Sequence, residues 1–121
     1  TSLIIAACEK NKDKNSTPSL EGKWELVNTI YLEVENGVEV SDYNYTGIAG
    51  DYIDFRNDHK VYSHVDGTDD VSGYKLLNNN KVDIEGDTLE IRSLTTASVT
   101  LYGKWYTNSN SYEENTVNLK R

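Results

Sequence analysis

The residues best suited to coordinating a metal ion gather in one short stretch of the chain. Asp66, Asp69 and Asp70 fall in a single predicted loop, and His59 and His64 lie just before it. A calcium-binding hand alternates its acidic residues and ends on a glutamate, and this stretch lacks that pattern. His59 falls at a predicted turn and His64 on the outward face of a predicted strand. The stretch therefore predicts a solvated acidic turn with surface histidines, and we expect no metal site.

Nucleophilic catalysis would need a thiol or hydroxyl beside a base. Cys8 is the only cysteine, and the chain contains no Gly-x-Ser-x-Gly turn and no serine that strand geometry places beside a histidine. Carboxylates are plentiful because the chain is acidic, but the strand pattern points most of them outward. We therefore expect no enzymatic activity and no cofactor.

The residues around Cys8 indicate a different chemistry. The first eight residues are apolar up to two alanines before Cys8, and a charged run begins at Glu9, which is typical of the end of a secretory signal. Ile5-Ala6-Ala7-Cys8 also resembles the lipobox of bacterial lipoproteins. The resemblance implies that residues 1–8 are the remnant of a signal peptide and that Cys8 is acylated and becomes the mature N-terminus. An edge strand or an accidental apolar tail with a free thiol is the alternative.

Composition and charge restrict the remaining chain to one acidic domain. The 121 residues carry a net charge of −8, and their lysines and arginines are dispersed singly, so a phosphate backbone would be repelled. We expect no nucleic acid partner and a monomer. Residues 9–19 contain no apolar residue and the only proline, and they read as a flexible tether. Residues 20–121 are left to form the folded domain.

The folded part predicts an all-β structure. Tyr, Thr and Val are frequent, helical periodicity is absent, and turn residues recur at short intervals, with Asn36-Gly37 as the strongest hairpin signal. Alternating segments between the turns predict nine strands: 22–34, 38–45, 50–56, 60–65, 71–77, 81–85, 88–94, 98–106 and 112–120. One of them, 38–45 or 81–85, is expected to be a short flap or an interrupted strand.

Each predicted strand has one apolar face. In the first strand this face carries Trp24, Leu26, Ile30, Leu32 and Val34, with Asn28 as its polar exception. Closing such a sheet on itself removes exposed edges, so the pattern predicts an antiparallel barrel with these faces inside. Trp24, two residues after Gly22, would plug one end of the barrel.

Three segments together resemble the lipocalin-like domains of lipoproteins from Bacteroides-type bacteria. They are the Gly-x-Trp opening at Gly22 to Trp24, the phenylalanine strand 51–58, and the strand, Leu-Thr turn and strand at 89–101. The resemblance implies an up-and-down antiparallel eight-stranded barrel and a lipid-anchored domain in the cell envelope, at the outer membrane. It also implies that Arg121, on the last strand, packs over Trp24.

Two functions are consistent with such a barrel. A small apolar or amphipathic ligand could occupy its interior, and the inward-facing candidates to line that site are Asn28, Ile30, Phe55, Ser63, Tyr74, Ile91, Ser93, Leu101 and Gly103. Alternatively, side chains fill the barrel, and its loops bind protein or glycan as a surface interaction domain. Tyr43, Tyr45 and Tyr52, around the loop 46–50, are the best exposed aromatic cluster for that role.

Overall fold

The computed structural model describes residues 17–78 and 80–121. Within that part the chain forms strands and tight turns, and no helix there is long and apolar enough to cross a membrane. The strands are β2 (Gly22–Glu35), β3 (Val38–Thr46), β4 (Tyr52–Phe55), β5 (Lys60–Val65), β6 (Thr68–Asn78), β7 (Lys81–Ile84), β8 (Asp87–Arg92), β9 (Ser98–Asn108) and β10 (Ser111–Lys120). The predicted all-β class is confirmed.

Eight of these strands close into an antiparallel barrel. Each strand from β4 to β10 pairs with the next one along the chain, β2 pairs with β4, and β10 pairs back onto β2. β3 pairs only with β2 and lies outside the ring. The predicted eight-stranded up-and-down barrel is confirmed, and the ninth segment, 38–45, is the strand left outside it.

Tight turns set the register of three hairpins. Asn36-Gly37, Asp66-Gly67 and Glu85-Gly86 all have positive φ at both residues, between 52° and 92°. Turns of this kind match the right-handed twist of the strands they join. Asn, Asp and Gly tolerate this backbone conformation, which explains why short polar pairs mark the hairpins in the sequence.

The barrel interior is packed with side chains. Trp24, Phe55, Leu119 and Val82 are the largest fully buried residues, each less than 2% exposed. Phe55 meets the ring of Tyr74 edge-on, with 5.1 Å between the ring centroids. The other core residues are Leu20, Leu26, Val61, Ile91, Val99 and Leu101. This packed barrel is a rigid body from which the longest strands extend.

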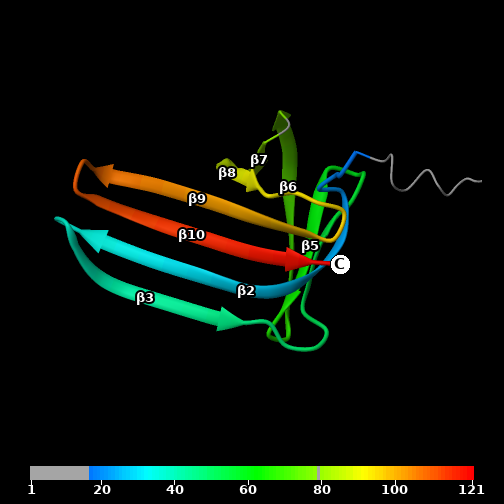
Figure 1. Ribbon diagram of the computed structural model, residues 1–121, viewed down its shortest axis with the longest axis horizontal. Helices are drawn as coiled ribbons and strands as arrows, with labels where there is room; N and C mark the ends of the chain where they lie inside the picture. Colours follow the sequence, from blue (N-terminus) through cyan, green and yellow to red (C-terminus); the bar gives the residue numbers. More distant parts are fainter. Residues whose placement is uncertain (1–16, 79) are drawn as a thin grey trace, which may run out of the picture.

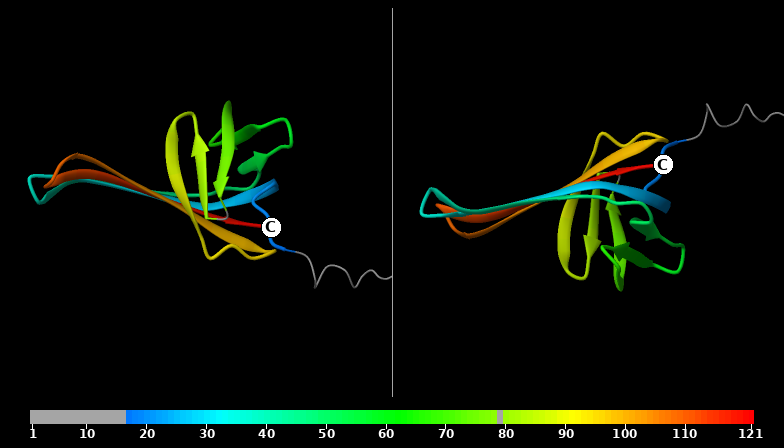
Figure 2. Two further views of the ribbon diagram at one scale, coloured as in Figure 1. Left: turned by 90° about the horizontal axis from the view of Figure 1, so that it is seen from above. Right: turned by 90° about the horizontal axis from the view of Figure 1, so that it is seen from below.

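Four strands continue beyond the barrel as a single layer, which we call the wing (28–46 and 103–117). Figure 1 shows β3, β2, β10 and β9 side by side in this layer, and Figure 2 shows it edge-on, projecting to one side of the barrel. β8 pairs only with residues 100–102 of β9, so the rest of β9 forms one edge of the wing. β3 forms the other edge.

A bulge in β2 marks the point where the barrel becomes the wing. Leu119 of β10 pairs with Leu26, but the preceding Asn118 pairs with Asn28, so Val27 is an extra residue. The extra residue reverses the alternation: Trp24 and Leu26 face the barrel interior, while Ile30 lies on the opposite, outer face and is 40% exposed. The predicted continuous inward face through Val34 is therefore wrong beyond Leu26.

Candidate functional site

One end of the barrel is closed by the segment that precedes β2. The Trp24 Nε1–H donates a hydrogen bond of 2.8 Å to the Leu20 carbonyl, and Leu20 is only 2% exposed. Arg121 holds the same segment from the other end of the chain, donating to the carbonyls of Ser19 and Glu21 at 2.9 Å each. Residues 19–21 are thus fixed across the end of the barrel.

The guanidinium of Arg121 also stacks on Trp24. Its central carbon lies 3.7 Å from the centroid of the indole ring, a cation–π geometry. A side chain at Gly22 would collide with this arrangement, because an added Cβ would lie 2.7 Å from Arg121 Nη1. Gly22 also has a φ of +121°, which other residues rarely adopt. The structure thus places Gly22, Trp24 and Arg121 together, as the family resemblance implies.

An apolar depression lies beside this clamp, at the mouth of the barrel. Its volume is about 420 Å³, within the range of small-molecule sites. It is lined by Thr17, Pro18, Ser19, Leu20, Leu76, Asn78, Ile91 and Leu94. None of these side chains carries a charge, although the chain as a whole has a net charge of −8. The mouth therefore offers a neutral, mainly apolar surface with hydroxyl and amide groups along one side.

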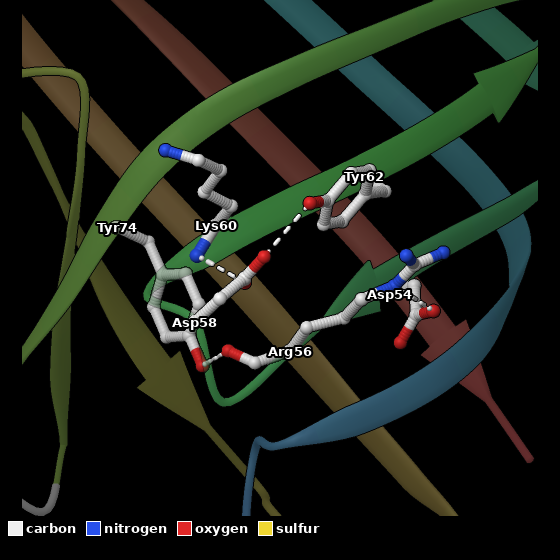
Figure 3. Close-up of polar contacts among 6 residues, drawn as sticks. All are labelled: Asp54, Arg56, Asp58, Lys60, Tyr62 and Tyr74. Atoms are coloured by element: carbon white, nitrogen blue, oxygen red, sulfur yellow. Dashed lines mark hydrogen bonds and ion pairs between the residues drawn. The ribbon is translucent and has the colours of Figure 1, made fainter.

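Tyr74 is a core residue of β6, 8% exposed, whose polar end is fixed by a hydrogen bond. Its hydroxyl donates a 2.7 Å hydrogen bond to the Arg56 carbonyl in the turn after β4 (Figure 3). Burial raises the pKa of this hydroxyl, so it remains a neutral donor. A second depression of about 210 Å³ lies on the other side of Leu76, lined in part by Tyr74, His59 and Glu21.

The turn that accepts the Tyr74 bond is itself held by polar contacts. Asp58 accepts hydrogen bonds from the Tyr62 hydroxyl at 2.8 Å and from the Lys60 backbone N–H at 3.0 Å (Figure 3). The bond between Tyr62 and Asp58 raises the pKa of the hydroxyl and lowers that of the carboxyl. Arg56 lies over the Tyr62 ring, 3.8 Å from its centroid. These contacts orient the Arg56 carbonyl, and through it Tyr74.

Five of the nine predicted ligand-lining residues belong to the interior side of the barrel. Phe55, Tyr74, Ile91 and Leu101 are buried in the core, and Ser63 is half-buried opposite Ile53. Among them, Ile91 also borders the mouth depression. Phe55 and Leu101 fill space in the packed interior, where they stabilise the fold.

The other four do not line the barrel interior: three lie off its inward face, and Gly103 lies on the buried face of β9 but beyond the ring. Asn28 lies on the outer face, where it accepts a hydrogen bond from Asn118, and Ile30 follows it there because of the bulge at Val27. Ser93 lies past the end of β8 with a φ of +53° and is exposed. Gly103 is in the wing, where the Trp105 ring covers it so closely that an added Cβ would lie 2.2 Å from a ring carbon.

Sequence reasoning missed most of the residues that line the mouth. Leu20 precedes the first predicted strand, and Leu94 falls in the turn after β8, so neither belongs to an alternating face. Leu76 has the same parity as the buried Tyr74 but is 48% exposed, because β6 runs past the end of its pairing with β5 at Gly73. The adjacent Leu77 is 44% exposed, lies at an irregularity in the pairing of β6 with β7, and does not line the depression. Two consecutive leucines just before the Asn78-Asn79-Asn80 run were the available signal.

The tyrosines proposed as an interaction cluster separate into two groups. The Tyr45 hydroxyl donates to Asp51 at 2.5 Å, which raises the pKa of Tyr45 to about 12. Tyr52 stacks on His64, with 5.8 Å between the ring centroids, and lies 4.2 Å beneath Lys23 Nζ. Tyr43 is 59% exposed on β3 in the wing. Only Tyr43 thus presents most of its surface to solvent.

Comparison of the chain with known proteins adds no assignment. No protein-family model and no curated protein matches it. Within residues 17–78 and 80–121, no group of three or more His, Cys, Asp or Glu side chains could hold a metal ion. His64 instead makes a 2.6 Å contact with Asp69, and Asp66 donates its backbone N–H to Asp51. Cys8 lies outside the described residues.

Proposed function

We propose that this protein is a binding module that holds a small apolar or amphipathic molecule at the mouth of its barrel. The observation that carries the proposal is the uncharged depression of about 420 Å³ bordered by Leu20, Leu76, Ile91 and Leu94. Burial of apolar ligand surface there would drive binding at roughly 25 cal/mol per Å². Asn78 and the Ser19 hydroxyl lie along the same depression and suit a single polar group on the ligand.

The mouth supports this function better than the interior does. Phe55 and Val82 are completely buried inside the ring, so a ligand there would have to displace core side chains. At the mouth the wall already exists, since Arg121 and Trp24 clamp the segment that contains Leu20. A ligand therefore needs no rearrangement of the barrel to bind.

Paired substitutions in β6 test the proposal. Leu76 lines the depression and Leu77 does not, yet they are neighbours with similar exposure, 48% and 44%. The probe is N-phenylnaphthylamine, an uncharged dye that fluoresces in apolar surroundings. We expect saturable binding to the native protein and to Leu77→Glu, and at least about tenfold weaker binding to Leu76→Glu, because a carboxylate in the mouth must lose its hydration. Equal binding by the two variants would rule out the mouth as the site.

The physiological ligand requires a separate measurement. Native mass spectrometry of the protein purified from its source should show a bound small molecule in the native chain and in Leu77→Glu, but not in Leu76→Glu. A molecule retained by all three proteins would place the binding site elsewhere.

We further propose that the domain is a lipocalin-like lipoprotein, attached to the bacterial cell envelope through Cys8. The Ile5-Ala6-Ala7-Cys8 motif and the polar run 9–19 support this anchor. A tether of that length reaches about 36 Å when extended, enough to hold the barrel clear of lipid headgroups. Cys8→Ser should abolish acylation, so the mass of the protein should no longer include a lipid, and a Cys8→Ser variant that still carried the lipid would disprove the anchor.

A further inference from the structure

The outer edge of β3 is an unpaired strand edge in the described part of the chain. β3 ends the sheet, and β2 is its only partner. It contains nine residues, which at roughly 3.3 Å per residue span about 30 Å. Backbone N–H and C=O groups that point away from β2 along this edge have no strand to pair with. Such an edge is a template on which another extended chain can add.

β3 carries few of the features that usually protect an edge strand. Natural edges are commonly guarded by lysine, proline, inward-pointing charges or bulges. β3 contains no lysine, arginine or proline, and its pairing with β2 passes over Val40, so a single bulge near its start is the one interruption of the edge. Val38 is 62% exposed, Val40 51% and Tyr43 59%. The opposite edge of the wing differs, because β9 carries Lys104, which lies 3.9 Å from Glu114. The two edges of one sheet are therefore unequal, and β3 is the accessible one.

The charge of the wing defines the chemistry of its partner. Residues 28–46 and 103–117 contain six carboxylates and a single cation: Glu33, Glu35, Glu39, Asp42, Glu113 and Glu114 against Lys104. Within the described residues, no ion pair involves Glu39 or Asp42 on β3. The Asp42 carboxylate raises the pKa of Glu39, because it can accept a hydrogen bond from the protonated Glu39 carboxyl and repels the ionised one. A cationic side chain placed beside them would replace this like-charge contact with an attractive one.

The same charges disfavour a second copy of this chain as the partner. A symmetric antiparallel pair of β3 strands would place two negatively charged strands side by side, because Glu39 and Asp42 are the only charged side chains of β3. Like charges opposed across strands destabilise a sheet, and each chain already carries a net charge of −8. Complementarity therefore favours a basic partner of different sequence.

We propose that β3 is a docking edge that takes up an extended, lysine- or arginine-rich segment of another protein as an additional strand. Main-chain hydrogen bonds along Val38–Thr46 supply the pairing. Cationic side chains on the outer face meet Glu39 and Asp42, and those on the inner face meet the exposed ring of Tyr43. This surface lies in the wing and shares no residue with the mouth of the barrel.

The test uses the full chain and an acetylated, amidated nine-residue peptide that alternates lysine with valine. Binding is followed by nuclear magnetic resonance and by amide hydrogen exchange. We expect saturable shifts centred on β3, slower exchange of the outward-facing amides of Val38–Thr46, and weaker binding as salt is raised. A further peptide carries N-methyl groups on every amide, so it keeps its charges but cannot donate main-chain hydrogen bonds. It should fail to bind, whereas the unmethylated peptide binds.

Charge is tested by paired reversals that leave the peptide unchanged. Glu39→Lys with Asp42→Lys should weaken binding by about tenfold or more, whereas Asp70→Lys with Asp87→Lys, an equal change of net charge on the barrel, should weaken it much less. Equal binding of the N-methylated and the unmethylated peptide would show electrostatic adsorption instead of strand addition. A peptide with glutamate in place of every lysine should bind more weakly, and equal binding would refute the basic partner. If no peptide caused any shift, the docking edge would be refuted. Dye binding at the mouth should be the same for the native protein and for both pairs of charge reversals.

Discussion

At the scale of single residues, the contact between Trp24 and Arg121 joins the two ends of the folded domain. The indole is fully buried on one face of the contact, and Arg121 brings three hydrogen bonds to backbone carbonyls, including one of 3.2 Å to Thr96. The planar guanidinium both stacks and donates, which a lysine could not do in the same place. This pair secures the segment that forms one wall of the proposed ligand site.

Trp24→Ala should be among the most destabilising single substitutions, costing about 3 to 5 kcal/mol. The change empties the centre of the barrel end and removes both the stacking partner of Arg121 and the donor to the Leu20 carbonyl. Lys23→Ala, on the exposed face of the same strand, should change stability by less than about 0.5 kcal/mol. Denaturant midpoints measure both, and comparable losses would contradict the assigned role of Trp24.

The hydrogen bonds of Asp51 link the stability of the fold in acid to its stability in alkali. Asp51 is 4% exposed and accepts hydrogen bonds from the Tyr45 hydroxyl and from the backbone N–H groups of Ile48 and Asp66. The Tyr45 bond, the largest contribution, holds the pKa of Asp51 below its usual range, and the same bond raises the pKa of Tyr45 to about 12. Asp51 thus fixes both β3 and the turn after β5 to the barrel.

The pH dependence follows from the direction of each shift. Because the folded pKa of Asp51 is lowered, its stabilisation is present above the unfolded pKa of about 3.9 and is lost as the pH falls through the folded value. For Tyr45 the folded pKa is raised, so its stabilisation is present below about pH 10 and is lost as the pH rises toward 12.

Asp51→Asn should lower stability at neutral pH and flatten the acid limb of the stability curve. It should also move the titration of one tyrosine toward pH 10, where ultraviolet absorbance detects tyrosinate. Tyr45→Phe identifies that tyrosine, because subtracting its alkaline titration from that of the native chain isolates Tyr45. Identical alkaline titrations of Asp51→Asn and the native chain would disprove the coupling.

At the scale of elements, strand positions were predicted well because their signals are local. The turn pairs Asn36-Gly37 and Glu85-Gly86 both have positive φ, and strands start within one or two residues of them. The inward face of β2 was not predicted beyond Leu26, because alternation cannot reveal an extra residue inside a strand. In the sequence, the apolar Val27 falls on the predicted outward face and the polar Asn28 on the predicted inward face. This mismatch was the visible trace of the bulge.

Gly47 is essential for the bulge at Val27. Its N–H donates a 2.8 Å hydrogen bond to the Val27 carbonyl, and an added Cβ would lie 2.0 Å from the Leu26 carbonyl oxygen. Gly47→Ala must therefore separate the two backbones, and we expect a loss of about 2 kcal/mol or more.

Gly37→Ala provides the comparison for this prediction. Nothing lies within 4 Å of a Cβ at Gly37, so only its φ of +80° is strained, at a cost of about 1 to 2 kcal/mol. Thermal midpoints of the two variants measure the difference. A smaller loss for Gly47→Ala than for Gly37→Ala would show that the close approach at the bulge is not required.

At the scale of the whole molecule, residues 17–78 and 80–121 combine a packed barrel with a sheet that no second layer from this part of the chain covers. The one-sided apolar strands predicted that the ring closes. They did not predict the wing, because Ile30, Leu32 and Val34 continue the apolar pattern of β2 outside the barrel. The mouth was missed for a related reason: its residues come from a strand end, a turn and the segment before β2. Local periodicity does not show which strands extend past the ends of the strands beside them.

The final prediction concerns where the folded domain begins. The sequence alone places this boundary after the polar tether at Ser19, but the Ser19 carbonyl accepts from Arg121 and Leu20 is buried in the core. A chain that starts at Thr17 should therefore keep the stability of the full-length protein. A chain that starts at Gly22 should lose about 2 to 5 kcal/mol with the Leu20 side chain, lowering the thermal midpoint by roughly 10 °C or more. It should also lose binding of the apolar dye, because one wall of the mouth is missing. Equal midpoints for the two shortened chains would mean that Leu20 closes the barrel without stabilising it.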